Sequence, residues 1–211
     1  ESVAGEFLVD TGLRGTGIMH TPFVDENDLI ARSAPTVHAT VGGGIGGRAT
    51  AHVGRVRSLT LAGVTIDDTY LSFSQATSGL ISTDYCSGII GSAVLQRYRV
   101  AFDYPRGRIL LWPADFDAER LDFDKSGMFL VADIADRSLV RVVDVIAGAP
   151  AAEAGLAVGN VILSVGGRRL ADAGLETIRR MLRAEAGTVY EVEYVRGGET
   201  RKTRLTLRRV V

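Results

Sequence analysis

The stretch VRVVDVIAGAPAAEAG, residues 140–155, decides the fold of the second half of the chain. Its first seven residues, Val140 to Ile146, are mostly β-branched and predict a strand. The Gly-Ala-Pro sequence that follows predicts a turn into a short helix, and Gly155 ends that helix. A strand, a turn and a short helix are therefore expected at the centre of this half.

Further strands and a second helix are predicted on either side of this stretch. The strands cover Met128 to Asp133, Val158 to Val165, Val189 to Arg196 and Thr200 to Leu207, and the last two form a hairpin across Gly197-Gly198. In the segment from Leu175 to Arg183, Leu175, Ile178 and Leu182 recur on one face of a helix.

Residues 127–210 resemble a bacterial PDZ domain of the kind found in high-temperature-requirement proteases. The resemblance rests on residues 142–146, on 149–156 and on Gly159-Asn160-Val161-Ile162, where the family commonly has Gly-Asp. It implies a small β-barrel with two helices, whose groove takes up a peptide C-terminus by strand addition. The peptide-binding residues it implies are Gly127, Met128, Phe129 and Leu130, whose backbone N–H groups cap a terminal carboxylate, and Ile178 on the helix.

The first half of the chain contains the sequence Phe7-Leu8-Val9-Asp10-Thr11-Gly12. An apolar strand here delivers an aspartate into a Thr-Gly turn. Catalysis by a carboxylate of this kind needs a second one that shares its proton, since like charges about 3 Å apart cannot both ionise. The alternative interpretation is an ordinary aspartate that caps a turn at the end of a strand.

Residues 5–112 resemble one lobe of a retropepsin-like or pepsin-like aspartic protease. The resemblance rests on Asp10-Thr11-Gly12, on the glycines at 42–47, and on Gly88-Ile89-Ile90-Gly91 leading into LQRYRVAFDY at 95–104. It implies an acid-protease-like β-barrel lobe in which Asp10 activates a water, Thr11 supports the turn and Gly12 allows close approach of a partner loop. The family usually has Ala or Ser after this triplet, where the chain has Leu13.

The glycine-rich segment Gly42 to Gly47 lies between two predicted strands. In the aspartic protease family such a hairpin is a flap that closes over substrate, and the flap residues would be Gly43, Gly44, Ile45 and Gly46. The alternative is a flexible hairpin tip without a role in binding, and the sequence favours neither. The segment lacks the Lys-Ser/Thr ending of a phosphate loop, so it does not predict nucleotide binding.

Two helices are predicted in the first half of the chain, a short one over Ser92 to Gln96 and a longer one that begins near Thr21. Thr21 and Pro22 are typical of a helix start, with Thr as the N-cap and Pro at the first helical position. Asp25 and Glu26 follow in the first turns, so the helix is expected to cover Pro22 to Ile30.

The whole chain is expected to be mainly β, with the aspartic-protease-like lobe at residues 1–119 and the PDZ domain at 120–211. The charged segment from Pro113 to Gly127 lacks periodicity and predicts a linker. The net charge of −1 gives no basic surface for nucleic acid, and the three histidines show no metal-ligand spacing. We therefore expect no nucleic-acid partner, no metal and no cofactor.

Together the two resemblances predict an aspartic endopeptidase that acts on peptide or unfolded protein substrates and binds peptide C-termini in its PDZ groove. The second aspartate would come from a lobe that precedes Glu1, or from a second copy of the chain in a homodimer. The alternative is a catalytically inactive protein that binds peptides. The bacterial proteins of this type resemble exported ones, and the sequence does not fix the compartment.

Overall fold

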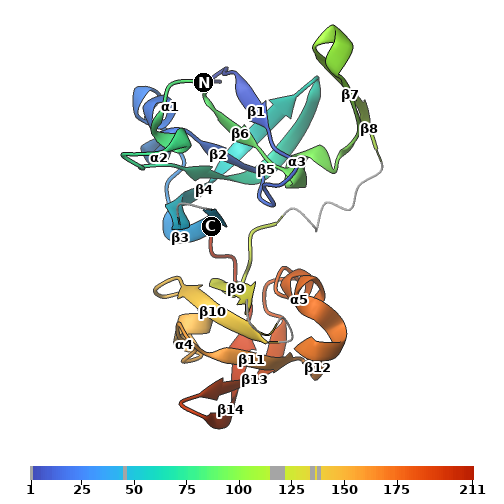
Figure 1. The fold of residues 1–211 in the computed structure, drawn as a ribbon. Coiled ribbons are helices and arrows are strands. Elements are labelled where there is room, and N and C mark those ends of the chain that lie inside the picture. The colour runs from blue at the N-terminus through green and yellow to red at the C-terminus, as the bar shows by residue number, and fades with distance from the viewer. Residues whose placement is uncertain (1, 45–46, 115–121, 134–135, 137–138) are drawn as a thin grey trace. The chain divides into compact units, whose positions relative to one another are not determined.

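The computed structural model describes residues 2–44, 47–114, 122–133, 136 and 139–211. The chain divides into two compact units: unit 1 is Glu1–Asp122 with Val211, and unit 2 is Phe123–Val210 (Figure 1). Each unit has its own hydrophobic core. Both are built mainly from strands, and unit 1 is a curled β half-barrel, which confirms the predicted fold class.

The main sheet of unit 1 has six strands in the order β1-β6-β2-β5-β4-β3. They are β1 (Phe7–Val9), β2 (Gly17–Met19), β3 (Val37–Gly44), β4 (Gly47–Leu61), β5 (Val64–Phe73) and β6 (Gly88–Ile90). Strand β6 runs parallel to β1 and antiparallel to β2. The long strand β5 supplies Ile66, Leu71 and Phe73 to the core, where Phe73 is fully buried.

The predicted helix over Pro22 to Ile30 is in fact two short helices, α1 (Thr21–Glu26) and α2 (Leu29–Arg32). Asp28 between them has φ 50° and ψ 42°, a left-handed conformation through which a right-handed helix cannot continue. The Asn27 side chain donates to the Phe23 carbonyl at 2.9 Å and closes the end of α1. Thr21 is the first helical residue, and His20 stands at the N-cap.

The rest of unit 1 comprises η1 (Leu80–Ser82), α3 (Ser92–Leu95), β7 (Tyr98–Asp103), η2 (Tyr104–Arg106) and β8 (Arg108–Pro113). Strands β7 and β8 form a separate antiparallel ribbon. Tyr98 anchors the base of this ribbon, because its ring is buried and its hydroxyl donates to the Leu61 carbonyl at 2.7 Å.

Gly91 lies at a close approach of two backbone segments in unit 1. Its N–H donates to the Thr16 carbonyl at 3.0 Å, so the chain after β6 lies directly against the turn between β1 and β2. A Cβ atom at this position would lie 2.1 Å from the Gly15 carbonyl oxygen. Only glycine fits here, which explains the glycine that ends the apolar run Ile89-Ile90.

Unit 2 is a five-stranded path in the order β14-β13-β11-β10-β9, with β12 paired to β11. Its elements are β9 (Met128–Ala132), β10 (Val140–Val145), α4 (Pro150–Glu153), β11 (Val161–Val165), β12 (Arg168–Arg169), α5 (Leu170–Met181), β13 (Val189–Arg196) and β14 (Glu199–Thr206). Each strand and helix predicted in this half is present, with ends that differ by a few residues. The stretch 140–155 forms β10, a turn and α4.

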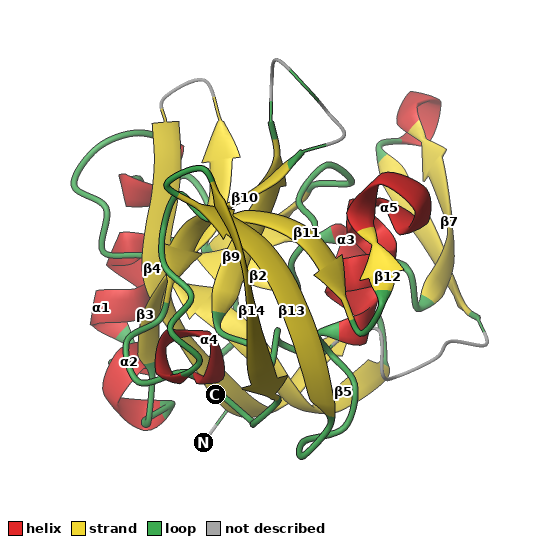
Figure 2. Ribbon diagram, turned by 90° about the horizontal axis from the view of Figure 1, so that it is seen from below, coloured by secondary structure: helices red, strands yellow, loops and turns green. Residues whose placement is uncertain are grey.

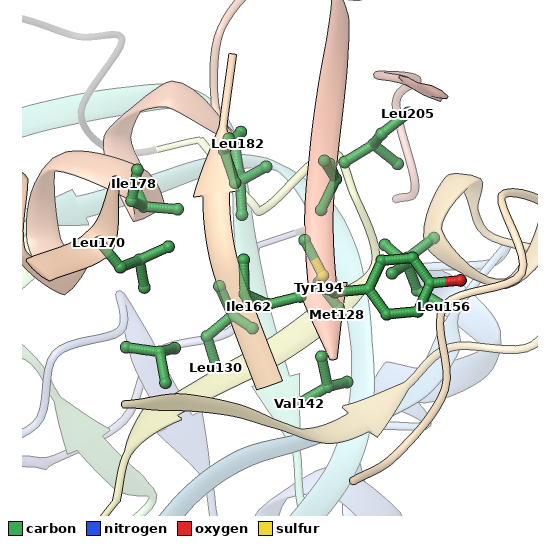
Figure 3. Close-up of a cluster of buried hydrophobic side chains, with 14 of the residues drawn as sticks. Met128, Leu130, Val142, Leu156, Ile162, Leu170, Ile178, Leu182, Tyr194 and Leu205 are labelled. Carbon is green, nitrogen blue, oxygen red and sulfur yellow. The ribbon is translucent and has the colours of Figure 1, made fainter. Parts of the chain in front are cut away.

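The core of unit 2 lies between α5 and the sheet, and Figure 2 shows α5 beside β11 and β12. Ile178 and Leu182 from α5 are fully buried, as are Val165 and Leu205 from the strands. Figure 3 shows these α5 side chains in one cluster with Met128 and Leu130. The helix face predicted from the sequence therefore packs on the sheet, and β9 lies at the sheet edge beside α5.

Candidate functional site

Strand β9 has an open edge, by which we mean the side that faces away from β10. Leu130 lies opposite Val142 in the β9–β10 register. The N–H of Val142 donates to the Asn160 carbonyl at 2.9 Å, and its own carbonyl accepts from Gly159, so its polar groups point away from β9. In an antiparallel sheet, two residues that lie opposite each other in a non-hydrogen-bonded pair turn their N–H and C=O groups away from each other. The backbone groups of Leu130 therefore face the open edge, and those of Met128 and Ala132 face the same way.

The loop before β9 is held by the partly buried carboxylate of Asp124. Asp124 Oδ1 accepts hydrogen bonds from the Ser126 N–H at 2.8 Å and the Gly127 N–H at 3.0 Å, and also from the Ser126 hydroxyl. Burial raises the pKa of Asp124 to about 6, although these hydrogen bonds and the charge of Arg183 act in the opposite direction. Ser126 Oγ in turn accepts from the Met128 N–H at 3.2 Å.

These contacts reduce the number of N–H groups that the predicted carboxylate-binding loop has for a bound peptide. The N–H groups of Gly127 and Met128 were expected to cap a terminal carboxylate, and the structure gives both of them internal acceptors. Gly127 itself is buried with φ 74°, and a Cβ there would lie 2.3 Å from the Ala149 side chain, so the loop is pinned against α4. The backbone groups of this segment that face the open edge are therefore those of Leu130 and the carbonyl of Met128.

Helix α5 places the guanidinium group of Arg179 at the open edge of β9. The Arg179 Nη2 donates to the Leu130 carbonyl at 2.6 Å, and its side chain is only 17% exposed. Its Nη1 lies 3.6 Å from Glu176 Oε2, one turn earlier on the helix. The predicted binding residue Ile178 is instead fully buried in the core. The hydrophobic face of α5 contains Ile178, and the residue that reaches β9 is its neighbour Arg179.

The structure places Asp10 at the end of β1, next to β6. Its N–H donates to the Ile90 carbonyl at 3.0 Å, and its Oδ1 accepts from the Gly12 N–H at 2.7 Å. Asp10 is half-buried, while Thr11 and Gly12 are exposed. Within the described part of the chain, Gly12 is the hydrogen-bond donor recorded for this carboxylate. This geometry is that of an aspartate that caps its own turn.

The glycine-rich segment forms the end of the β3–β4 hairpin. Gly43 lies opposite Arg48, and Gly44 lies opposite Gly47, so both predicted flap glycines belong to the paired strands. Ile45 and Gly46 lie outside the described residues. The choice between a flap and a plain hairpin tip stays open.

A shallow hollow of about 350 Å³ lies on unit 1, and Cys86 lines it. The Cys86 thiol donates to the Gly88 carbonyl at 3.3 Å and lies 3.9 Å and 4.0 Å from the two ring nitrogens of His20. These are long contacts, and His20 Nδ1 lies closer to another partner, the Thr83 carbonyl, at 3.1 Å.

Among the residues that the structure describes, none of the helices has the length and apolar composition of a membrane-spanning segment. No group of three or more His, Cys, Asp or Glu side chains in those residues is placed to hold a metal ion.

Comparison with known proteins identifies the second half of the chain. Residues 141–196, which run from β10 to the end of β13, match the family model of the PDZ domain. The predicted PDZ domain is thus confirmed, although the match covers only about a quarter of the chain. No curated protein matches the chain.

Several solved structures are similar to parts of the chain. A photosystem II D1 C-terminal processing protease is 29% identical over 41% of this chain and 23% of its own, with a TM-score of 0.39. An HtrA-type protease with a decapeptide is 14% identical over 83% of this chain and 60% of its own, with a TM-score of 0.35. A serine endoprotease from Yersinia pestis is 15% identical over 84% and 63%, with a TM-score of 0.32. The chain spans less than two thirds of each of them, and at these TM-scores no catalytic chemistry carries over.

The predicted aspartic endopeptidase is wrong. The three similar structures named above are a C-terminal processing protease, an HtrA-type protease and a serine endoprotease, and none of them is a retropepsin-like protease. The hydrogen bond that Asp10 accepts from the Gly12 N–H of its own turn fits a turn-capping aspartate as well as a catalytic one, so the roles given to Asp10, Thr11 and Gly12 stay predictions. The sequence motif for a catalytic aspartate and that for a capping aspartate are the same. The second aspartate lobe, whether from a preceding domain or from a homodimer partner, is unsupported with it.

Proposed function

We propose that the PDZ domain of this chain captures a peptide by adding it as a strand to the open edge of β9. The observation that carries the proposal is the orientation of Leu130, whose N–H and C=O point away from β10. The C=O accepts one hydrogen bond from Arg179, and a carbonyl oxygen can accept a second from a peptide. An extended peptide can pair with such groups through its own backbone. The family match to residues 141–196 supports the same assignment.

The composition of the two sheet edges favours β9 over β14. Natural sheets protect their edges with charged side chains, which oppose pairing with another strand. Strand β14 follows this rule, since Glu199, Arg201, Lys202 and Arg204 are all exposed. Strand β9 reads Met-Phe-Leu-Val-Ala and has no charged residue. It is therefore the edge suited to accept a partner strand.

A peptide end, more than an internal segment, fits this edge. The loop from Asp124 to Met128 turns sharply into β9 through the positive φ of Gly127, and it is fixed by internal hydrogen bonds. An added strand that continued past Met128 would run into this loop. We therefore propose that the peptide ends beside the loop and extends along β9 toward Ala132.

Hydrogen–deuterium exchange tests the proposal directly. The probe is a pool of decapeptides with free carboxyl ends, in which Gly-Ser residues precede five positions randomised over Ala, Val, Leu, Phe and Ser. We expect the pool to slow exchange several-fold in β9 of the full chain and to leave β14 unchanged. Slower exchange in β14, or no change in β9 at saturating peptide, would sink the proposal.

Substitution of Ala132 by proline tests whether the peptide pairs with the backbone of β9. Its N–H faces the open edge, and proline is tolerated in an edge strand where the missing N–H would have faced solvent. Ala132→Pro should therefore keep the thermal melting profile of the chain and bind the pool more weakly. Unchanged binding by a folded Ala132→Pro chain would show that the peptide does not pair with this edge.

A further inference from the structure

Arg179 is the charged side chain that stands at the open edge of β9. Its Nη2 is fixed 2.6 Å from the Leu130 carbonyl, in the middle of the strand. Helix α5 holds it there, because the preceding residue, Ile178, is locked in the core with no exposed surface. The position of this cation is therefore set by the fold and not by a freely moving side chain.

The guanidinium has hydrogen-bonding capacity beyond its present contacts. It carries five N–H donors, of which one serves the Leu130 carbonyl. Its acidic neighbour Glu176 is 3.6 Å away with a side chain that is 67% exposed, and an ion pair of that kind contributes little. A carboxylate that arrived along β9 would meet a largely buried cation, which is the setting in which arginine pairs most strongly.

We propose that Arg179 determines the specificity of the groove by pairing with an acidic side chain of the bound peptide. An added strand lies about 4.8 Å from its neighbour, so the residue that pairs with Leu130 passes directly beside the guanidinium. The partner is then a peptide with Asp or Glu a few residues before its end. This inference rests on strand addition at β9, as proposed above.

A side-chain carboxylate suits Arg179 better than the terminal one. The peptide end lies beside the loop at Gly127, whereas Leu130 is three residues further along the strand. Successive residues of a strand advance about 3.3 Å, so the terminal carboxylate would stand roughly 10 Å from the level of Leu130. The acidic residue is thus expected two to four positions before the C-terminus.

The test uses two matched decapeptide pools and the full chain. Both have five terminal positions randomised over Ala, Val, Leu and Phe, and one of these positions in turn carries Glu in the first pool and Gln in the second. Binding is measured by fluorescence anisotropy against wild type, Arg179→Gln and Arg180→Gln. The last removes the same charge from a neighbouring, exposed position.

For wild type we expect the Glu pool to bind about fivefold to tenfold more tightly than the Gln pool, as for a partly buried ion pair. Arg179→Gln should bring this ratio close to one while it still binds the Gln pool, and Arg180→Gln should keep the wild-type ratio. Amidation of the peptide end should leave the ratio unchanged, which separates the side chain from the terminal carboxylate.

Three results would overturn the inference and leave strand addition intact: equal binding of both pools to wild type, a ratio that survives in Arg179→Gln, or a ratio that vanishes with amidation. The first of these is measured on wild type, so it does not depend on whether a variant folds. Failure of wild type to bind either pool is a different outcome, because it would refute strand addition itself.

Discussion

Asp124 links the stability of unit 2 to pH. Its Oδ1 accepts three hydrogen bonds, from the N–H and hydroxyl of Ser126 and from the N–H of Gly127. Burial raises the pKa of this carboxyl from 3.8 to about 6. We therefore expect unit 2 to lose stability as pH rises from the ordinary pKa of the carboxyl to its raised value in the folded state.

The direction follows from proton binding. In the unfolded chain the carboxyl has its ordinary pKa of 3.8, so between pH 4 and pH 6 the folded state holds a proton that the unfolded state has lost. The free energy of unfolding falls as pH rises through this window, by about 1.4 kcal/mol for each pH unit. The contribution is greatest below pH 4 and is lower by about 3 kcal/mol above pH 6.

The variant that isolates this effect is Asp124→Asn. All three hydrogen bonds go to one oxygen, so an amide oxygen at the same place can accept them without carrying a charge. The free energy of unfolding of wild type minus that of Asp124→Asn should then fall by about 3 kcal/mol between pH 4 and pH 6.5 and stay level at higher pH. Asp124→Ala leaves the three donors without an acceptor, so it should be less stable than Asp124→Asn by on the order of 1–3 kcal/mol throughout the range.

Urea unfolding between pH 3.5 and pH 8 measures these differences. Trp112, the only tryptophan, belongs to unit 1, so its fluorescence follows that unit, and the far-UV circular dichroism change that remains follows unit 2. A wild-type minus Asp124→Asn difference that is constant with pH, or that rises between pH 4 and pH 6, would refute the reasoning.

Two substitutions test the cores of the two units. Leu182→Ala removes a fully buried side chain from unit 2 and should lower the free energy of unfolding by about 2–5 kcal/mol, as measured by urea titration. The control Val158→Ala, at a position that is 61% exposed, should lower it by under about 0.5 kcal/mol. Equal losses in the two variants would contradict the packing described. Gly91→Ala places a Cβ 2.1 Å from the Gly15 carbonyl oxygen, so unit 1 should unfold at a lower urea concentration, as followed by Trp112 fluorescence. In the control Gly42→Ala the new Cβ meets no atom within 4 Å, and the urea midpoint should not change. A Gly91→Ala chain as stable as wild type would disprove the close approach.

The sequence predicted unit 2 well because its signals are local. Alternation in β13, the glycine pair at its turn and the Leu175-Ile178-Leu182 face each identify an element without reference to the rest of the fold. The helix expected over Pro22 to Ile30 failed at Asp28, whose left-handed backbone no local signal announces.

The candidate site was harder to predict, since it depends on contacts between distant residues. Arg179 lies 49 positions from the Leu130 carbonyl that it contacts, and on a helix wheel it looks like an ordinary solvated charge. The hydrophobic pattern pointed instead to Ile178, which the fold buries. The role of Asp10 stays a prediction, because a hydrogen bond from the Gly12 N–H two residues away is compatible with a turn cap and with a catalytic turn alike.

The open edge of β9 also bears on how this protein behaves at high concentration. An uncharged strand edge is a template on which another copy of the same strand can pair and begin aggregation. Two copies joined through β9 would each bring an Arg179 guanidinium, held 2.6 Å from a Leu130 carbonyl, to the shared edge. Like charges brought together there repel, so Arg179 opposes self-pairing while a peptide carboxylate would neutralise it. The solubility of the free chain and its choice of ligand would then depend on the same side chain.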